Sequence, residues 1–189
     1  MIEIKKGLKI CTLDIESTGL KADYAKIMCV VIKEYIHRGS KKGKVWTIRI
    51  DDKKNPDKHS DKWIVQETYK VLSEFDVLVT WNGTYFDRKF LKTRAFLHGM
   101  KPALPMIHRD LCIFARTFLF GSRKLKFQAA VILGKTDKTF TTPKVWFALM
   151  RHEKWALDFM VAHCRYDVSD TEKLYRKYLP FLNQKVEAR

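Results

Sequence analysis

The sequence predicts a single α/β domain with a mixed β-sheet. Its 189 residues fit one domain, and a hydrophobic content of 46% is enough for a full apolar core. Three strand-like segments come first, and helical segments then alternate with shorter strand-like runs. This order of elements describes an α/β domain whose sheet is mixed.

The first three expected elements are strands. Residues 8–15 alternate and are apolar, and residues 27–35 form an apolar run that ends in Lys and Glu. A basic turn at 37–42 leads to a third strand at 44–50. Residues 51–61 are polar, contain a proline and are expected to form a loop.

The next segments alternate between helix and strand. Residues 63–75 carry apolar side chains at a helical period, and residues 76–80 predict a short buried strand. A second helix is expected over 86–98, where Gly99 ends it. The fifth strand is expected at 106–111.

The last third of the chain is expected to be mainly helical. Short helices are predicted over 112–120 and 125–133, and Gly134 closes the second. Residues 135–147 are basic and rich in Thr, which predicts a loop. Residues 155–182 follow a helical pattern in which one break is left open.

The charge balance predicts a polyanionic partner. The formal net charge is +16 and the isoelectric point is about 9.7. Nucleic acid is the most frequent partner of such proteins, and an anionic membrane surface is less frequent. Eight basic residues are candidates for phosphate contacts: Arg38, Lys41, Lys42, Arg123, Lys124, Lys126, Lys135 and Lys138. Four aromatic residues are expected in the core: Trp46, Trp81, Tyr85 and Trp146.

The cysteines and the terminal sequence predict a cytoplasmic protein without a membrane segment. No Cys-x-x-Cys pair occurs, so neither a zinc knuckle nor a disulfide framework is expected. The first ten residues lack the apolar core of a signal peptide. No run approaches the roughly 18 apolar residues that a membrane span needs.

Two carboxylates on the first strand are candidate metal ligands. Asp14 and Glu16 are two residues apart, so they share a face at the carboxyl end of the strand. Two like charges side by side are unfavourable unless a cation lies between them, and oxygen ligands suit Mg²⁺ or Mn²⁺. On this motif alone, a pair that is merely solvated is the more common explanation.

Asp87 is the next candidate ligand. It follows the strand at 76–80 and lies where the next helix begins. Thr84-x-x-Asp87 also matches a capping box, so a structural role at the helix start remains open.

The C-terminal helix offers two pairs spaced one turn apart. These are His163 with Asp167, and Tyr166 with Asp170. At roughly 100° per residue, Asp167 lies about 55° from the centre of the apolar stripe and Asp170 about 115° from it. We therefore expect Asp167 at the edge of the core, and Asp170 and Tyr166 on the exposed side. Two structural alternatives stay open: Asp167 as a boundary residue paired with a nearby cation, and His163 as a helix-surface histidine.

Together these motifs resemble the DnaQ-like (DEDD) 3′–5′ exonuclease superfamily, which has a ribonuclease H-like fold. The matching residues are Leu13-Asp14-Ile15-Glu16-Ser17-Thr18-Gly19-Leu20, Asn82-x-x-x-Phe86-Asp87 and an Asp in the C-terminal helix. The motifs look most like the proofreading domain of family B DNA polymerases and its free-standing predicted exonuclease relatives. Asp167-Val168, followed by Glu172-Lys173-Leu174-Tyr175 and Leu179-Pro180, matches the tail pattern of those relatives and selects Asp167. The resemblance predicts a mixed five-stranded sheet flanked by helices, an exonuclease domain over 1–182 and a tail over 183–189.

The resemblance implies a two-metal phosphodiesterase that removes nucleotides from DNA 3′ ends, on single strands or frayed ends. Two Mg²⁺ or Mn²⁺ ions would be held by Asp14, Glu16, Asp87 and Asp167. Thr18 and Leu20 would lie against the terminal base and sugar, whereas Asn82 and Phe86 would contact the penultimate nucleotide, Phe86 by stacking.

His163 departs from the family pattern, because it stands where the tyrosine branch has Tyr, four residues before the last Asp. Either residue can orient or deprotonate the attacking water, although an imidazole titrates near pH 6.5 and a phenol near pH 10. Two other functions stay open: a 3′–5′ exoribonuclease and a catalytically idle nucleic-acid-binding module. A polymerase or helicase partner in trans also stays open.

Overall fold

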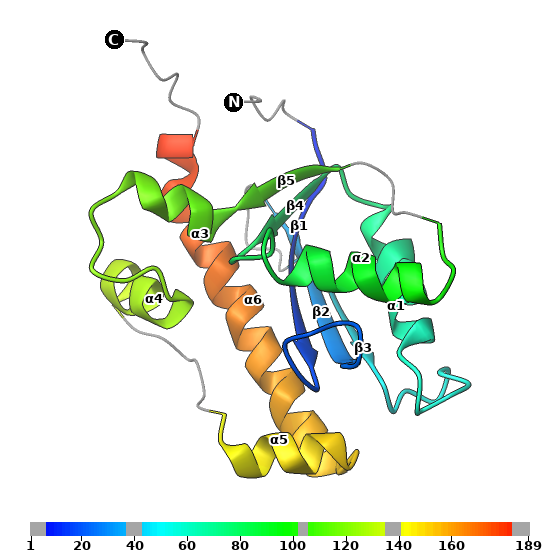
Figure 1. The fold of residues 1–189 in the computed structure, drawn as a ribbon. Coiled ribbons are helices and arrows are strands. Elements are labelled where there is room, and N and C mark those ends of the chain that lie inside the picture. The colour runs from blue at the N-terminus through cyan, green and yellow to red at the C-terminus, as the bar shows by residue number, and fades with distance from the viewer. Residues whose placement is uncertain (1–6, 37–42, 102–105, 135–140, 183–189) are drawn as a thin grey trace.

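A five-stranded sheet in the order β3-β2-β1-β4-β5 forms the centre of the fold in this computed structural model, which describes residues 7–36, 43–101, 106–134 and 141–182 (Figure 1). The strands are β1 (Ile10–Ser17), β2 (Ile27–Tyr35), β3 (Val45–Arg49), β4 (Val77–Thr80) and β5 (Ile107–Asp110). β1 pairs antiparallel with β2 and parallel with β4, while β3 joins β2 antiparallel and β5 joins β4 parallel. The predicted mixed five-stranded sheet is therefore confirmed.

Helices pack on both faces of this sheet. The helices are α1 (Lys62–Leu72), α2 (Asp87–Leu97), α3 (Leu111–Phe114), α4 (Leu125–Leu133), α5 (Pro143–Met150) and α6 (Lys154–Leu182), and a 3₁₀ turn spans Ala115–Thr117. α6 lies along one face and contacts β1, β2 and β4, whereas α1 and α2 lie together on the other side (Figure 1). Because both faces are covered, the central strands need apolar residues on both sides.

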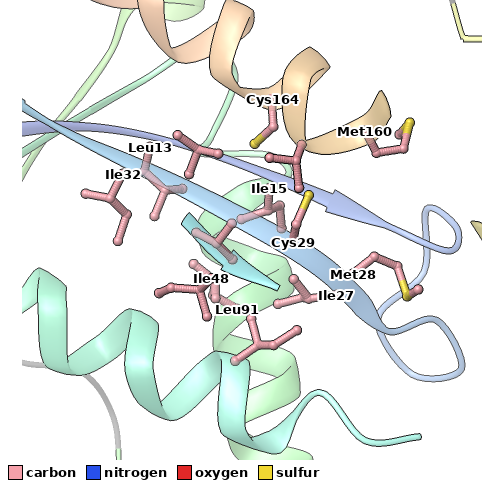
Figure 2. Close-up of a cluster of buried hydrophobic side chains, with 14 of the residues drawn as sticks. Leu13, Ile15, Ile27, Met28, Cys29, Ile32, Ile48, Leu91, Met160 and Cys164 are labelled. Atoms are coloured by element: carbon pink, nitrogen blue, oxygen red, sulfur yellow. The ribbon is translucent and has the colours of Figure 1, made fainter. Parts of the chain in front are cut away.

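The core consequently lies on both sides of β1 and β2. Every residue of β2 from Ile27 to Ile32 is buried, as is expected for a strand between two layers of helices. In Figure 2, Cys164 and Met160 of α6 approach the sheet from one side, while Leu91 of α2 lies on the other side. The central strand β1, which carries Asp14 and Glu16, is thus held from both faces.

Most predicted elements are present, and the differences have physical reasons. The helix expected over 112–120 is only α3 and the following 3₁₀ turn. The loop expected over 135–147 is wrong from Pro143 onward, because Pro143 begins α5, and proline is favoured in the first turn of a helix. α6 continues without the break left open from the sequence.

Two expectations about the whole chain concern membrane-spanning helices and the boundary of the domain. No helix in the described part of the chain is both long and apolar enough to cross a membrane. The basic turn at 37–42 and the tail at 183–189 lie outside the described residues, and the boundary of the domain at residue 182 stays a prediction.

Candidate active site

Asp14 and Glu16 lie on the part of β1 that extends beyond its pairing with β4. β4 pairs with β1 only over Ile10–Thr12, so the edge of β1 is open past that point. The helix α6 packs against β1 here, and the Cys164 thiol donates a hydrogen bond to the backbone oxygen of Asp14 at 3.1 Å. The two carboxylates are therefore at the end of β1, beneath α6.

Asp87 reaches this open edge from the start of α2. Its Oδ1 accepts a hydrogen bond from the backbone N–H of Ile15 at 3.1 Å, so the side chain takes a position that a longer β4 would occupy. Phe86 is the N-cap residue of α2, and the helix has no side-chain cap hydrogen bond. The capping-box interpretation of Thr84-x-x-Asp87 is therefore wrong.

His163 and Asp167 approach from α6. Both side chains are buried, so a helix-surface histidine is excluded. The Nε2 atom of His163 lies 3.7 Å from Oε1 of Glu16 and 4.0 Å from Oδ2 of Asp167. The imidazole is thus between a carboxylate of β1 and a carboxylate of α6.

The acidic side chains of the site lie close enough together to raise the pKa values of Asp14 and Asp87. Burial raises the pKa of Asp14 well above its ordinary value, and the negative charges of Asp167, Asp87 and Glu16 raise it further. Burial likewise raises the pKa of Asp87 to about 7, and the charges of Asp110 and Asp167 add to this, although hydrogen bonds from two backbone N–H groups lower it. The four predicted ligands therefore lie near enough to interact electrostatically in one partly buried, negatively charged site.

Asp170 corrects the expected helical face. The sequence predicts it on the exposed side, but only 2% of Asp170 is exposed, and its Oδ1 lies 3.1 Å from Nζ of Lys173. The single-stripe prediction failed because α6 is covered on several sides, by β1, β2, β4, α3 and α4. Tyr166 is 39% exposed, as expected. The charges that raise the pKa of Asp14 and Asp87 include Asp167 but not Asp170.

The four residues expected to contact the substrate lie on two loops beside these carboxylates. Leu20 is 81% exposed in the loop between β1 and β2, where the Thr18 hydroxyl accepts the N–H of Lys26 at 3.0 Å. Asn82 is exposed in the loop after β4 and has a φ of 66°. Phe86 is half-buried, with its ring centroid 5.5 Å from that of Phe90. Contact of these four residues with a nucleotide remains a prediction.

Asp110 is a further carboxylate at the site, and sequence reasoning gave it no role. Its side chain accepts backbone N–H groups from Asn82 at 2.9 Å and Thr84 at 2.8 Å. It also caps α3 by accepting the N–H groups of Cys112 and Ile113. An Asp directly before a helix is a capping signal that could have indicated it.

A buried ion pair holds the loop between β1 and β2. Asp61 is buried and receives hydrogen bonds at 2.8 Å from two guanidinium nitrogens of Arg94, and His98 approaches it at 2.6 Å. Burial alone would raise the pKa of Asp61, but the hydrogen bonds from Arg94 and from the N–H of Ile27 hold it below its ordinary value. A third guanidinium nitrogen of Arg94 donates to the backbone oxygen of Ala22 at 3.1 Å, which fixes the loop.

The donor set fits a hard divalent cation. Oδ2 of Asp14 is enclosed and accepts no hydrogen bond from the described residues. Because the negative charges of the neighbouring carboxylates repel that of Asp14, a bound cation would stabilise the ionised site. Among the described residues, no group of three or more His, Cys, Asp or Glu side chains is arranged closely enough to hold a metal ion. The carboxylate oxygens match Mg²⁺ or Mn²⁺ in chemistry.

Comparisons with known proteins agree with this fold. A family model for the RNase_H superfamily matches residues 11–179. A comparison with curated proteins gives no match. Among solved structures, the family B DNA polymerase from the hyperthermophilic archaeon Pyrobaculum calidifontis superposes with a TM-score of 0.72 at 17% identity, over 96% of this chain and 26% of the polymerase.

At this identity the polymerase shows the fold alone, and the chain spans about a quarter of its length. The predicted ribonuclease H-like fold, and its likeness to a family B DNA polymerase, are confirmed. Because the family model covers most of the sequence, from β1 to the last turns of α6, the chain belongs to the RNase_H superfamily.

Proposed function

We propose that the chain is a 3′–5′ exonuclease that hydrolyses phosphodiester bonds at DNA 3′ ends with two bound Mg²⁺ or Mn²⁺ ions. The observation that carries the proposal is the convergence of Asp14, Glu16, Asp87 and Asp167, whose charges raise the pKa values of Asp14 and Asp87. Buried carboxylates that repel one another are typical of sites that bind divalent cations. Membership of the RNase_H superfamily supports a nuclease reaction.

In this proposal each side chain has a separate task. The four carboxylates hold the ions, which supply an activated water and stabilise the leaving 3′ oxygen. His163, whose Nε2 lies 3.7 Å from Glu16, orients the attacking water and takes up its proton. Leu20 and Asn82, both exposed, contact the last two nucleotides.

The net charge of +16 supports a nucleic-acid substrate. We propose DNA as the preferred substrate, on single-stranded or frayed ends. Two alternatives are an RNA substrate and nucleic-acid binding without catalysis, and the digestion experiment described next distinguishes both from a DNA exonuclease.

The test is the digestion of single-stranded oligonucleotides that carry a 5′ label. DNA and RNA 20-mers are incubated with Mg²⁺, with Mn²⁺ or with a chelator, and a circular DNA tests for internal cleavage. We expect a ladder that shortens from the 3′ end by one nucleotide at a time, faster on DNA, and no reaction with chelator. Asp14→Asn should abolish the ladder, whereas Asp158→Asn, at a partly exposed position on α6, should retain it.

Each other outcome contradicts part of the proposal. A ladder on RNA alone would assign an exoribonuclease, and cleavage of the circle would assign an endonuclease. Tight binding without any cleavage would assign the idle binding module. Full activity of Asp14→Asn would show that the reaction occurs elsewhere.

A further inference from the structure

A basic pocket lies beside the loop that carries Asn82 and Phe86. It has a volume of about 470 Å³ and is lined by Arg116, Phe118, Phe120, Gly121, Ser122 and Arg123. Both arginines are exposed, and neither forms an ion pair with a carboxylate of the described residues. Their charges are therefore available to an anion.

The two arginines act on the same small region. Burial and the charge of Asp110 raise the pKa of Cys112, while the charges of Arg123 and Arg116 both lower it. Because Arg116 and Arg123 both line the pocket, it offers two cations to one ligand. Paired guanidinium groups suit the non-bridging oxygens of a phosphate.

Aromatic rings form the other wall of the pocket. The ring of Phe118 stacks on that of Tyr178 at 5.6 Å and 28°, and the ring of Phe120 lies 5.6 Å from Phe118. Tyr178 belongs to α6, and its hydroxyl donates to the side chain of Gln128 at 2.8 Å. The wall is thus fixed by the main helix, and flat rings of this kind accept nucleobases by stacking.

Tyr85 connects this pocket to the carboxylates. The sequence places it in the core, but it is 52% exposed, because it lies in the loop between Asn82 and Phe86. Its ring centroid is 5.8 Å from the guanidinium carbon of Arg116 and 5.5 Å from Nζ of Lys89. Trp81 begins the same loop directly after β4, and its indole N–H donates to the backbone oxygen of Arg123 at 3.1 Å. An exposed aromatic and basic surface therefore runs from Asn82 to the pocket.

We propose that this pocket binds an upstream nucleotide of the single strand whose 3′ end lies at the carboxylates. Arg116 and Arg123 contact its phosphate, while the rings of Tyr85 and Phe118 contact bases along the path. The polarity of the strand rests on the proposed exonuclease function, but binding itself does not. We expect the pocket to set a minimum substrate length, because an upstream site is filled only by a strand that extends beyond the nucleotides at the 3′ end.

Binding without cleavage tests this proposal separately from the reaction. Fluorescence anisotropy in the presence of chelator measures the affinity of the intact protein for labelled 3-mers and 12-mers of DNA and RNA. The variant Arg116→Ala/Arg123→Ala is compared with Lys62→Ala/Lys70→Ala, which removes two cations from α1 on the other side of the sheet.

We expect the arginine variant to lose at least about tenfold in affinity for 12-mers and little for 3-mers, while the lysine variant stays near wild type. The slope of log affinity against log salt for the 12-mer should fall by about 0.7, the value for one phosphate contact to a single strand. Arg116→Lys/Arg123→Lys, which keeps both charges, should recover part of the affinity.

Equal 12-mer affinities of the arginine and lysine variants would overturn the pocket assignment, whatever the nuclease assay gives. An equal loss for 3-mers and 12-mers would also overturn it, because the arginines would then act at the 3′ end. Length-dependent loss in a protein that shows no 3′ ladder would leave the pocket standing and refute the exonuclease instead.

Discussion

Replacing Asp87 with Asn should stabilise the metal-free protein at alkaline pH. The pKa of Asp87 is about 7 in the folded protein, against an ordinary value of 3.8, so the folded state binds this proton more tightly than the unfolded chain. The stabilising effect of that proton is complete below pH 3.8 and is lost as the pH rises through 7. At pH 8 the ionised side chain costs about 4 kcal/mol, since each pKa unit is worth about 1.4 kcal/mol. Asn keeps the shape and an oxygen acceptor for the N–H of Ile15, so it avoids much of this cost.

Urea denaturation with chelator at pH 8 and pH 5 measures the effect. We expect the free energy of unfolding of Asp87→Asn to exceed that of wild type by about 1–4 kcal/mol at pH 8. At pH 5, where the side chain of the folded wild type is protonated, the difference should be less than about 2 kcal/mol. Asp23→Asn, which removes one exposed carboxylate, is the control for net charge. Added Mg²⁺ should stabilise wild type more than Asp87→Asn. A variant that is less stable than wild type at pH 8 would refute the account of a repulsive carboxylate cluster.

Substitutions at four further residues test the site and its support. Asp167→Asn should abolish the nuclease ladder, whereas Asp170→Asn should stay within a few-fold of wild type; the reverse pattern would assign the site to Asp170. His163→Ala should lower kcat by about 10²–10⁴-fold, and His163→Tyr should regain part of it in the same assay, whereas wild-type rates for the alanine variant would exclude a role in proton transfer. Asp61→Ala should lower the free energy of unfolding by about 3–5 kcal/mol, because it leaves Arg94 buried without its partner, and a loss below about 1 kcal/mol in urea denaturation would contradict this.

Local sequence signals predicted the elements whose bounds follow from a continuous apolar run or from a residue that ends a helix. β2 was predicted with its observed bounds, because a strand covered on both faces reads as one apolar run. α4 also begins and ends as predicted, since Gly134 adopts a φ of 75° at its end. α5 was missed because the residues before it are basic and rich in Thr, which favoured a loop, although Pro143 signals the start of a helix.

The site was predictable where spacing alone brings residues together. Asp14 and Glu16 share a strand face, and His163 and Asp167 share a helix face, so their proximity follows from regular geometry. The burial of Asp170 was not predictable in this way, because it depends on which elements surround α6.

The four hydrogen bonds accepted by Asp110 have a consequence for local opening of the protein. This carboxylate joins the backbone of the loop after β4 to the start of α3, two segments that are separate in the sequence. Neither segment can detach without removing two of the hydrogen bonds that this partly buried carboxylate accepts, so both should open in one step. The amide protons of Asn82, Thr84, Cys112 and Ile113 would then exchange with solvent at similar free energies. The loop after β4, which lies beside the carboxylates, and the start of α3 would then open and close as one cooperative unit.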